Sequence, residues 1–293
     1  LEYPGGPLID KYSKSGNINA FTFGKPKIKD LDFSFSGLKT SIMNKINSSL
    51  MLNPKFIEKH NPRIGLITLA SDFRIEKDFN NIIYGRDIDL YSNRIKSYNP
   101  LTNETLKKMA DDITDVTKEI LPDQKLDCVA YGCTSGTIAA GYKSIYEKIN
   151  LAKPNTKVTT PITSAINALK KLKINKISIF TPYTDEINQS VIKYFEEENI
   201  EISELSYFDI ASDLDIGRVD PEYLYQVLSK QDLSKSDALF VSCTALPVLS
   251  IINDLEKKLG KIVLSSNQTL IWDTLNQIYY KNKIEGYGEL FNN

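Results

Sequence analysis

Two hydrophobic patterns alternate along the chain from residue 63 onward. Short runs of branched apolar residues, such as residues 64–70, are typical of buried strands. Comparable runs lie at 128–131, 158–160, 176–180, 200–207, 238–242 and 261–264, and a further short strand is expected at 87–91. Between these runs, apolar residues recur every three or four positions and predict helices at 102–120, 137–149, 162–172, 184–199, 221–228, 247–259 and 268–280.

Alternating strands and helices with apolar strands predict an α/β protein with parallel sheets covered by helices. Three segments also repeat in the same order, namely 63–71 with 176–184, 126–137 with 236–247, and 158–169 with 263–274. The repeat predicts two similar parallel-sheet α/β lobes with pseudo-twofold symmetry and an active site in the cleft between them. Chance similarity between common strand–turn–helix units is the alternative explanation.

Residues 1–60 differ in character from the rest of the chain. They form polar, lysine-containing segments with one amphipathic stretch at 37–52, where apolar residues recur at helical spacing. Pro54 and Pro62 follow this stretch and indicate a boundary. We therefore expect a separate, poorly ordered segment at 1–60, a first lobe at 63–160 plus 266–290, and a second lobe at 161–265.

Charge and composition exclude several classes of protein. The chain has 293 residues, with 36 Lys and Arg against 37 Asp and Glu, so it is not a strongly basic nucleic-acid binder. No apolar run approaches the roughly 20 residues of a membrane-spanning helix. His60 is the only histidine, which leaves little basis for a Ser-His-Asp triad or a histidine-rich metal site. Neither GxGxxG nor a Walker A motif is present, and we expect no metal and no cofactor.

The three cysteines are the main candidates for chemistry near neutral pH. An odd number of cysteines, without a secretory signal pattern, predicts free thiols and a cytoplasmic protein. Cys133 and Cys243 each follow a predicted strand in a Cys-Thr turn, and Cys128 lies inside a strand as a core residue. A helix that begins after Cys133 is expected to lower the pKa of its thiol. Burial as a small apolar residue is the alternative for each cysteine, but two matching turns favour function.

Further polar residues lie where predicted strands end, which is the edge at which α/β folds bind ligands. These candidate substrate-binding residues are Ser71, Asp72, Thr134, Ser135, Tyr183, Thr244 and Ala245. Each has an ordinary structural explanation as well, such as core packing for Tyr183. Residues 212–220 are expected to form either a lid or a solvated loop, and residues 265–267 either donate to a ligand or cap the last helix.

Eight motifs from Arg63 to Ile278 carry a family resemblance: LITLASDF, YNPLTNETL, LDCVAYGCTSGT, VTTPITSAINALK, FTPYTDEIN, DIGRVDP, DALFVSCTALP and SSNQTLIWDTL. In these motifs the chain resembles the maleate isomerase/arylmalonate decarboxylase group of the Asp/Glu racemase superfamily, and within it the EutA-type ectoine-utilisation proteins. The resemblance implies a cofactor-independent enzyme that holds a small carboxylate between two lobes, with cysteines on opposite faces of the reacting carbon.

The resemblance also bears on individual residues. Decarboxylase members replace the first cysteine with glycine, so the presence of both Cys133 and Cys243 favours racemase or cis–trans isomerase chemistry. Tyr183 matches the tyrosine of the second lobe. Asp72 stands where many maleate isomerases carry asparagine, and a carboxylate there would repel a dianion such as maleate unless it were protonated or paired.

A second resemblance covers residues 1 to about 52. The segments LEYPGGPLIDKYSKSGN and LDFSFSGLKTSI resemble an internal stretch of TsaD, the tRNA threonylcarbamoyladenosine synthesis protein. The family's metal-binding histidine motif is absent, so the segment is not expected to carry that activity. A genuine extension of the two-lobed protein is the alternative.

Three functions remain open from the sequence. The leading hypothesis is a racemase or epimerase of a small carboxylate, an amino acid or an ectoine-derived compound, in which Cys133 and Cys243 exchange protons with the substrate. The second is a maleate-type cis–trans isomerase with a covalent cysteine adduct. The third is a carboxylate-binding protein without turnover. The expected partner is a small carboxylate and a second copy of the chain, with no nucleic acid and no membrane.

Overall fold

The computed structural model describes residues 5–17, 19, 35–48 and 54–292, which fall into two units divided after Glu58. In the first unit, α1 (Gly5–Ser13) was not expected from the sequence. The helix expected at 37–52 is present as α2 (Phe35–Ser48), and the remainder of that prediction lies outside the described residues. The prediction that residues 1–60 are poorly ordered falls partly on residues outside the described ranges, so it stays a prediction.

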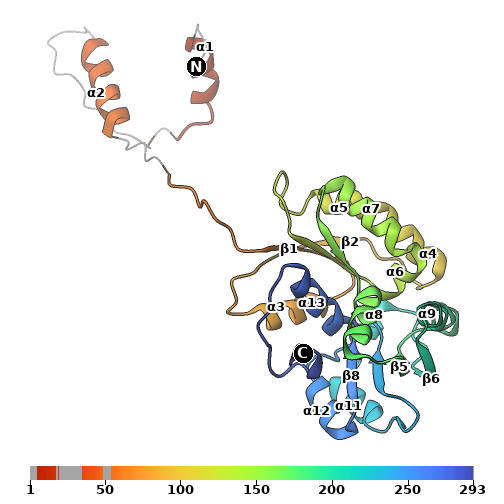
Figure 1. The fold of residues 1–293 in the computed structure, drawn as a ribbon. Coiled ribbons are helices and arrows are strands. Elements are labelled where there is room, and N and C mark those ends of the chain that lie inside the picture. The colour runs from red at the N-terminus through yellow and green to blue at the C-terminus, as the bar shows by residue number, and fades with distance from the viewer. Residues whose placement is uncertain (1–4, 18, 20–34, 49–53, 293) are drawn as a thin grey trace. The chain divides into compact units, whose positions relative to one another are not determined.

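The second unit contains two four-stranded parallel sheets (Figure 1). The first sheet has the order β2-β1-β3-β4, with β1 at Arg63–Leu69, β2 at Asp89–Ile95, β3 at Cys128–Gly132 and β4 at Lys157–Thr159. The second has the order β6-β5-β7-β8, with β5 at Lys176–Thr181, β6 at Glu201–Tyr207, β7 at Ala238–Val241 and β8 at Ile262–Ser265. The two sheets share one strand order, which confirms the predicted α/β class with two similar parallel sheets.

Burial distinguishes the inner strands from two of the four edge strands, since the edge strands β4 and β8 are also largely buried. All residues of β3 and β7 are buried, as their continuous apolar sequences predict. The edge strands β2 and β6 are largely half-exposed and carry more polar residues. Inner strands therefore anchor each sheet, and the turns that follow them start from rigid positions.

Helices cover the sheets in the order that the sequence indicates. Their bounds are α3 (Ile75–Ile83), α4 (Asn103–Met109), α5 (Ile113–Lys118), α6 (Thr134–Ala140), α7 (Tyr142–Ala152), α8 (Pro161–Leu172), α9 (Asp185–Glu197), α10 (Asp213–Gly217), α11 (Pro221–Leu228), α12 (Ile252–Leu259) and α13 (Ser266–Gln277), with short 3₁₀ turns at Ala110–Asp112 and Glu289–Asn292.

Three predicted helices need correction, and two further helices were not predicted. The helix expected at 102–120 is divided by the 3₁₀ turn into α4 and α5. The one expected at 137–149 is α6 and α7, because Gly141 has a φ of +80° that ends α6. The one expected at 247–259 begins only at Ile252. Helix α3 was not predicted, and the segment expected as a lid or loop contains the short helix α10.

The last helix returns to the first sheet. Helix α13 packs on α8, β3 and β4, and Figure 1 shows it beside α3 and α8. Ser265 caps it with a complete capping box, in which Gln268 reciprocates. The assignment of 266–290 to the first lobe stays a prediction, although these contacts agree with it. Among the described residues, no helix combines the length and the apolar character that crossing a bilayer requires.

Candidate active site

The residues singled out in the sequence lie at the carboxyl ends of the inner strands of both sheets. Ser71 and Asp72 follow β1, and Tyr183 follows β5. The two cysteine turns, 133–135 and 243–245, follow β3 and β7. Since β1 pairs with β3 and β5 pairs with β7, each sheet presents two of these turns side by side.

The serine at the start of α13 ties the two cysteine turns together. The Ser266 hydroxyl accepts hydrogen bonds from the Thr134 hydroxyl and from the backbone N–H of Cys243, both at 2.9 Å. The Thr244 hydroxyl donates to the carbonyl of Gly132 at 3.3 Å. All four side chains are buried, so the bonds hold the turns of the two sheets in one fixed arrangement.

Both sulfurs are enclosed, with Cys133 4% exposed and Cys243 5% exposed. Burial raises the pKa of the Cys133 thiol to about 12, although the N–H of Gly136 donates to its sulfur at 3.2 Å. Burial also raises the pKa of Cys243 well above its ordinary value, against smaller lowering effects of the Ala245 N–H and the Tyr183 hydroxyl. The expectation of a lowered thiol pKa at Cys133 is wrong for this closed arrangement, because loss of hydration outweighs the helix and its N–H groups.

The backbone at Cys243 is strained. Its φ is +97°, a value that residues with a side chain rarely adopt. Hydrogen bonds from Ser242 N–H to the Phe180 carbonyl and from Cys243 N–H to Ser266 hold the turn in this shape. Strain of this kind concentrates at functional sites, where it aims a side chain.

Two tyrosine side chains, Tyr183 and Tyr131, lie near the sulfurs. The Tyr183 hydroxyl accepts a hydrogen bond from Ser242 at 3.4 Å, and its pKa is raised by burial and then by the neighbouring Cys243 and Cys133. The Tyr131 hydroxyl is fully buried and has no hydrogen-bond partner within the described structure. A Cβ on Gly136 would meet the Cys133 sulfur at 2.8 Å and the Tyr131 hydroxyl at 3.1 Å, so both groups meet at that glycine.

Tyr131 and Gly136 show what the sequence did not reveal. Tyr131 lies inside β3, and the alternation of a fully buried strand gives no sign of which side chain faces a site. Gly136 was noticed only as one of several small residues in GCTSG. The close approach of a sulfur and a hydroxyl to its Cα explains why no larger residue fits there.

Two buried carboxylates complete the arrangement. The Asp72 Oδ1 accepts hydrogen bonds from the N–H groups of Arg74 and Ile75 at 2.7 and 3.1 Å, and Asp72 Oδ2 has no hydrogen-bond partner among the described residues. Asp213, at the start of α10, accepts a 2.6 Å hydrogen bond from the Ser71 hydroxyl. Burial raises the pKa of both carboxyls, that of Asp213 to about 6. Asp213 was not a predicted site residue, because its segment reads equally well as a solvated loop.

Further contacts fix α10 and the residues before it against the first sheet's loops. The Arg74 guanidinium donates to the Gly217 carbonyl at 3.0 and 3.2 Å. The Phe73 ring packs directly against Gly217, where an added Cβ would lie only 2.7 Å from a ring carbon. The backbone N–H of Leu101 donates to the Ala211 carbonyl at 3.0 Å. These contacts show that residues 211–217 are held against the first sheet's loops, while the expected lid role of residues 212–220 stays a prediction.

Known proteins are similar to this chain in sequence and in fold. The model of the arylmalonate decarboxylase family matches residues 90–291. The chain belongs to the arylmalonate decarboxylase family. Its relatives include the maleate isomerase of Geobacillus stearothermophilus, which is 28% identical over 243 residues, or 78% of this chain and 96% of that protein. The fold is also that of the Nocardia farcinica maleate cis-trans isomerase with a covalently bound succinylcysteine intermediate, with a TM-score of 0.72 and 21% identity over 78% of this chain and 98% of the other.

A second family model, that of TsaD or tRNA N6-adenosine threonylcarbamoyltransferase, matches residues 1–164 and thus overlaps the first. The TsaD protein of Riemerella anatipestifer is 52% identical over 60 residues, which are 20% of this chain and 18% of that protein. The chain therefore joins a stretch of TsaD sequence to a protein of the arylmalonate decarboxylase family. It spans less than a fifth of the TsaD relative.

These likenesses confirm the prediction that this chain belongs to the maleate isomerase/arylmalonate decarboxylase group of the Asp/Glu racemase superfamily. The chain is an isomerase. The closer likeness to EutA-type proteins and the roles of individual site residues stay predictions.

Proposed function

We propose that the protein isomerises a small carboxylate with two thiols, Cys133 and Cys243, that act on opposite faces of one reacting carbon. The observation that carries this proposal is the pairing of the two Cys-Thr turns. They follow equivalent strands of two equivalent sheets, and the Ser266 hydroxyl joins them directly. Such an arrangement favours chemistry with an acid on one face and a base on the other.

In the racemase or epimerase form of this reaction, one cysteine reacts as thiolate and the other as thiol. The thiolate takes the proton from the carbon next to the carboxylate, and the bonding pair moves into the carboxylate to give an enediolate. The second thiol then donates its proton to the opposite face, so the two sulfurs have exchanged states after one turnover. The hydroxyls of Thr134, Ser135 and Thr244 are the candidate donors to the developing oxyanion, each worth about 3–4 kcal/mol. In the closed structure Thr134 donates to Ser266 and Thr244 donates to the Gly132 carbonyl, so these two hydroxyls must turn toward the substrate when it binds.

The thiols of the closed site are neutral, because burial raises the pKa of both. Thiolate formation therefore requires either an open form, in which water reaches a sulfur, or a ligand that lowers the thiol pKa. Closure after binding then excludes water and strengthens the hydrogen bonds to the oxyanion. The hydroxyl of Tyr183, beside Cys243, is a further proton donor to that sulfur.

A covalent cis–trans isomerisation is the second candidate, and the succinylcysteine intermediate held by the Nocardia farcinica enzyme favours it. One thiolate forms an S–C bond to a carbon of the double bond, and the π pair moves toward the adjacent carboxylate. The resulting single bond rotates, the pair returns, and the S–C bond breaks to release the thiolate. This reaction uses one nucleophilic sulfur, so the two cysteines would have unequal roles.

Deuterium exchange separates the two reactions. The full chain is incubated in D2O with both enantiomers of aspartate, glutamate and 2,4-diaminobutyrate, with ectoine and hydroxyectoine, and with maleate, and the α-carbon signals are followed by proton NMR. We expect exchange with inversion in the wild type and its loss in both Cys133→Ser and Cys243→Ser. Conversion of maleate to fumarate without exchange would instead establish the covalent reaction, and a cysteine adduct in mass spectrometry would identify the nucleophile.

Cys128→Ser is the matched control for these variants. Cys128 is as deeply buried as the other two cysteines, but it lies inside β3, where its sulfur is 3.9 Å from the Thr159 hydroxyl. Its replacement tests the loss of a buried thiol without touching the proposed site. Racemisation that survives in both Cys133→Ser and Cys243→Ser would overturn the two-thiol proposal, and saturable binding without any turnover would indicate a carboxylate-binding protein.

The proposal includes a cellular setting. The described cysteines 128, 133 and 243 are all free, which fits a reducing compartment, and we propose the cytoplasm. A homodimer and an ectoine-derived substrate stay predictions.

A further inference from the structure

Two carboxylates beside the thiols lack a cationic partner. Asp72 is 2% exposed and Asp213 is 5% exposed. Within the described residues, neither takes part in a salt bridge. Buried carboxylates are normally paired or bound to a ligand, because the loss of hydration is costly. The site therefore holds two carboxyl groups that no cationic side chain of the described protein pairs with, and this unpaired burial raises the pKa of both.

Asp72 has one free oxygen in this enclosed space. Its Oδ1 is engaged by the N–H groups at the start of α3, and its Oδ2 is buried without a partner. The nearby Thr244 hydroxyl lowers the pKa of Asp72, but its proton is donated to the Gly132 carbonyl. Asp72 Oδ2 therefore keeps a position for a ligand, beside the Thr244 hydroxyl.

Asp213 approaches the same space from the second sheet's side of the fold. It accepts the Ser71 hydroxyl, and its charge and that of Asp72 act on each other. Among charged side chains, Asp213 and then Asp72 have the largest effects on the pKa of Cys133, and both also act on Cys243. The two carboxyls are therefore near enough to both sulfurs to act on them electrostatically.

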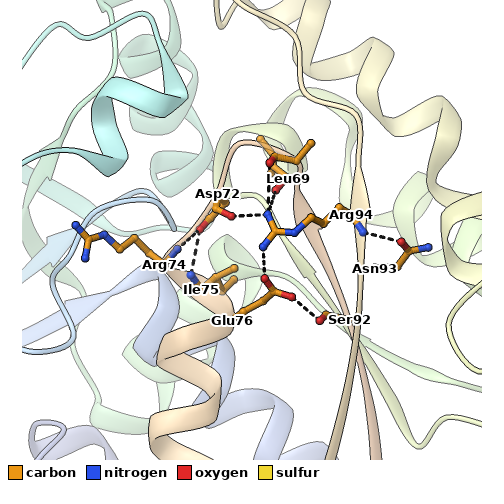
Figure 2. Close-up of polar contacts among 9 residues, drawn as sticks. Leu69, Asp72, Arg74, Ile75, Glu76, Ser92, Asn93 and Arg94 are labelled. Carbon is orange, nitrogen blue, oxygen red and sulfur yellow. Dashed lines mark hydrogen bonds and ion pairs between the residues drawn. The ribbon is translucent and has the colours of Figure 1, made fainter.

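The arginines of this region are engaged elsewhere. Figure 2 shows the Arg94 guanidinium bound to main-chain carbonyls, including that of Asp72 at 2.6 Å, and to the Glu76 carboxylate. The Arg74 side chain extends away from the Asp72 carboxylate in the same view, and it donates to the Gly217 carbonyl. Neither guanidinium hydrogen-bonds to a carboxylate oxygen of Asp72 or Asp213 in the described structure.

From this geometry we infer, building on the proposed function, that the substrate is a small amino carboxylate whose cationic nitrogen binds between Asp72 and Asp213. The hydroxyls and N–H groups of the cysteine turns then receive its carboxylate. A ligand with two carboxylates and no cation would place like charges against Asp72 and Asp213. Recognition of a cation therefore distinguishes this protein from relatives that are named for maleate.

A cationic ligand also changes the thiols. When Asp72 and Asp213 are ionised, their negative charge raises the pKa of both sulfurs. A bound ammonium group compensates that charge and lowers the thiol pKa, which makes the thiolate easier to form. The substrate thus supplies part of the activation that the closed site lacks, and a nitrogen-free analogue does not.

The test compares ligands that differ in one group. Isothermal titration calorimetry on the full chain measures binding of aspartate against malate, of glutamate against 2-hydroxyglutarate, and of 2,4-diaminobutyrate and maleate. The variants are Asp72→Asn and Asp213→Asn, in which the amide oxygen can still accept the hydrogen bonds that the aspartate accepts. Asp254→Asn, an exposed acid on α12, is the control for loss of one negative charge.

We expect the wild type and Asp254→Asn to bind at least one amino carboxylate more tightly than its hydroxy analogue. In Asp72→Asn and Asp213→Asn that preference falls by about ten- to hundredfold, as expected for one charge-assisted hydrogen bond. Melting temperatures near that of the wild type confirm that these variants are folded. Equal or tighter binding of malate or maleate, no binding of any amino carboxylate, or an unchanged preference in both folded Asn variants would overturn the inference.

The inference and the proposed function fail in different experiments. If the protein isomerises only carboxylates without nitrogen, and does so with its cysteines, the two-thiol proposal stands and the inferred cation site is wrong. Asp72-dependent binding of amino carboxylates without isomerisation confirms the cation site and removes the reaction.

Discussion

The Ser71 hydroxyl donates a hydrogen bond of 2.6 Å to the carboxylate of Asp213, and so joins the turn after β1 to helix α10 across 142 positions of the chain. Together with the Arg74 contact to Gly217, this bond holds the segment at 211–217 closed over the buried site. Since both sulfurs are buried in this state, a substrate enters only when the segment opens.

Removal of the Ser71 hydroxyl is expected to loosen this segment. In Ser71→Ala, Asp213 loses the hydroxyl that donates to its buried carboxyl group. The loss is expected to destabilise the closed form by about 1–3 kcal/mol relative to the open form. Hydrogen–deuterium exchange, followed by mass spectrometry, should become faster at 211–219 and stay unchanged in β5 and β7. The control is Ser203→Ala. Ser203 lies on the edge strand β6, and this change removes its hydrogen bond to the Lys235 carbonyl. Equal exchange in both variants would contradict a latch role.

The stability of the protein is expected to fall as the pH rises from about 4 to 6. Burial raises the pKa of Asp213 from 3.8 to about 6, so in this window the folded state binds more protons than the unfolded state. The free energy of unfolding therefore decreases with rising pH, by an amount on the order of 3 kcal/mol for two pKa units. Asp72 and Asp78, whose pKa values burial also raises, act in the same direction.

Urea unfolding at several pH values between 4.5 and 8 checks this sign. Asp213→Asn cannot ionise, so its free energy of unfolding should depend less steeply on pH than that of the wild type. Asp254→Asn should follow the wild type, because Asp254 is exposed. A wild type that gains stability steadily over this range would contradict the buried, neutral state of Asp213.

Addition of one methyl group at Gly136 is expected to disrupt the site. The Cβ of Gly136→Ala would lie 2.8 Å from the Cys133 sulfur and 2.9 Å from the Met109 methyl, so the sulfur must move. Overpacking of this kind costs about 1–3 kcal/mol of stability, and turnover should fall by much more than a loss of folded protein explains. Gly6→Ala adds a methyl group that meets nothing within 4 Å, and serves as control. Unchanged turnover in folded Gly136→Ala would separate the Cys133 position from catalysis.

The strained backbone at Cys243 predicts an unusual order of stabilities. Glycine tolerates the φ of +97° at this position, so Cys243→Gly should be more stable than Cys243→Ala by about 1 kcal/mol. At Cys133 the φ is −144°, and there the glycine variant should be the less stable of the pair. Denaturant unfolding of the four variants measures both differences. The same order at both positions would show that the turn at Cys243 relaxes when its side chain is removed.

The sequence alone determined the elements and the chemistry that they carry. Branched apolar runs identified both sheets, because a buried parallel strand needs continuous apolar side chains whatever surrounds it. The repeat of the Cys-Thr turn predicted that Cys133 and Cys243 occupy equivalent positions, and strand ends placed Ser71 and Asp72 at the carboxyl edge of one sheet and Tyr183 at that of the other. Local breaks were less predictable, since the split at Gly141 depends on one residue's φ angle.

Only the tertiary structure decided which polar groups are buried and how they are charged. A helix following Cys133 predicts a lowered thiol pKa, but burial between two sheets reverses the sign, and burial is a sum over distant segments. From the sequence, Asp213 could equally be a solvated acid, but in the structure it is hydrogen-bonded to Ser71. The sequence indicates Tyr131 only as a core residue, whereas the structure brings its hydroxyl and the Cys133 sulfur to the same glycine, Gly136. Periodicity along the chain reports local structure, whereas the environment of a titratable group depends on contacts that join residues far apart in sequence.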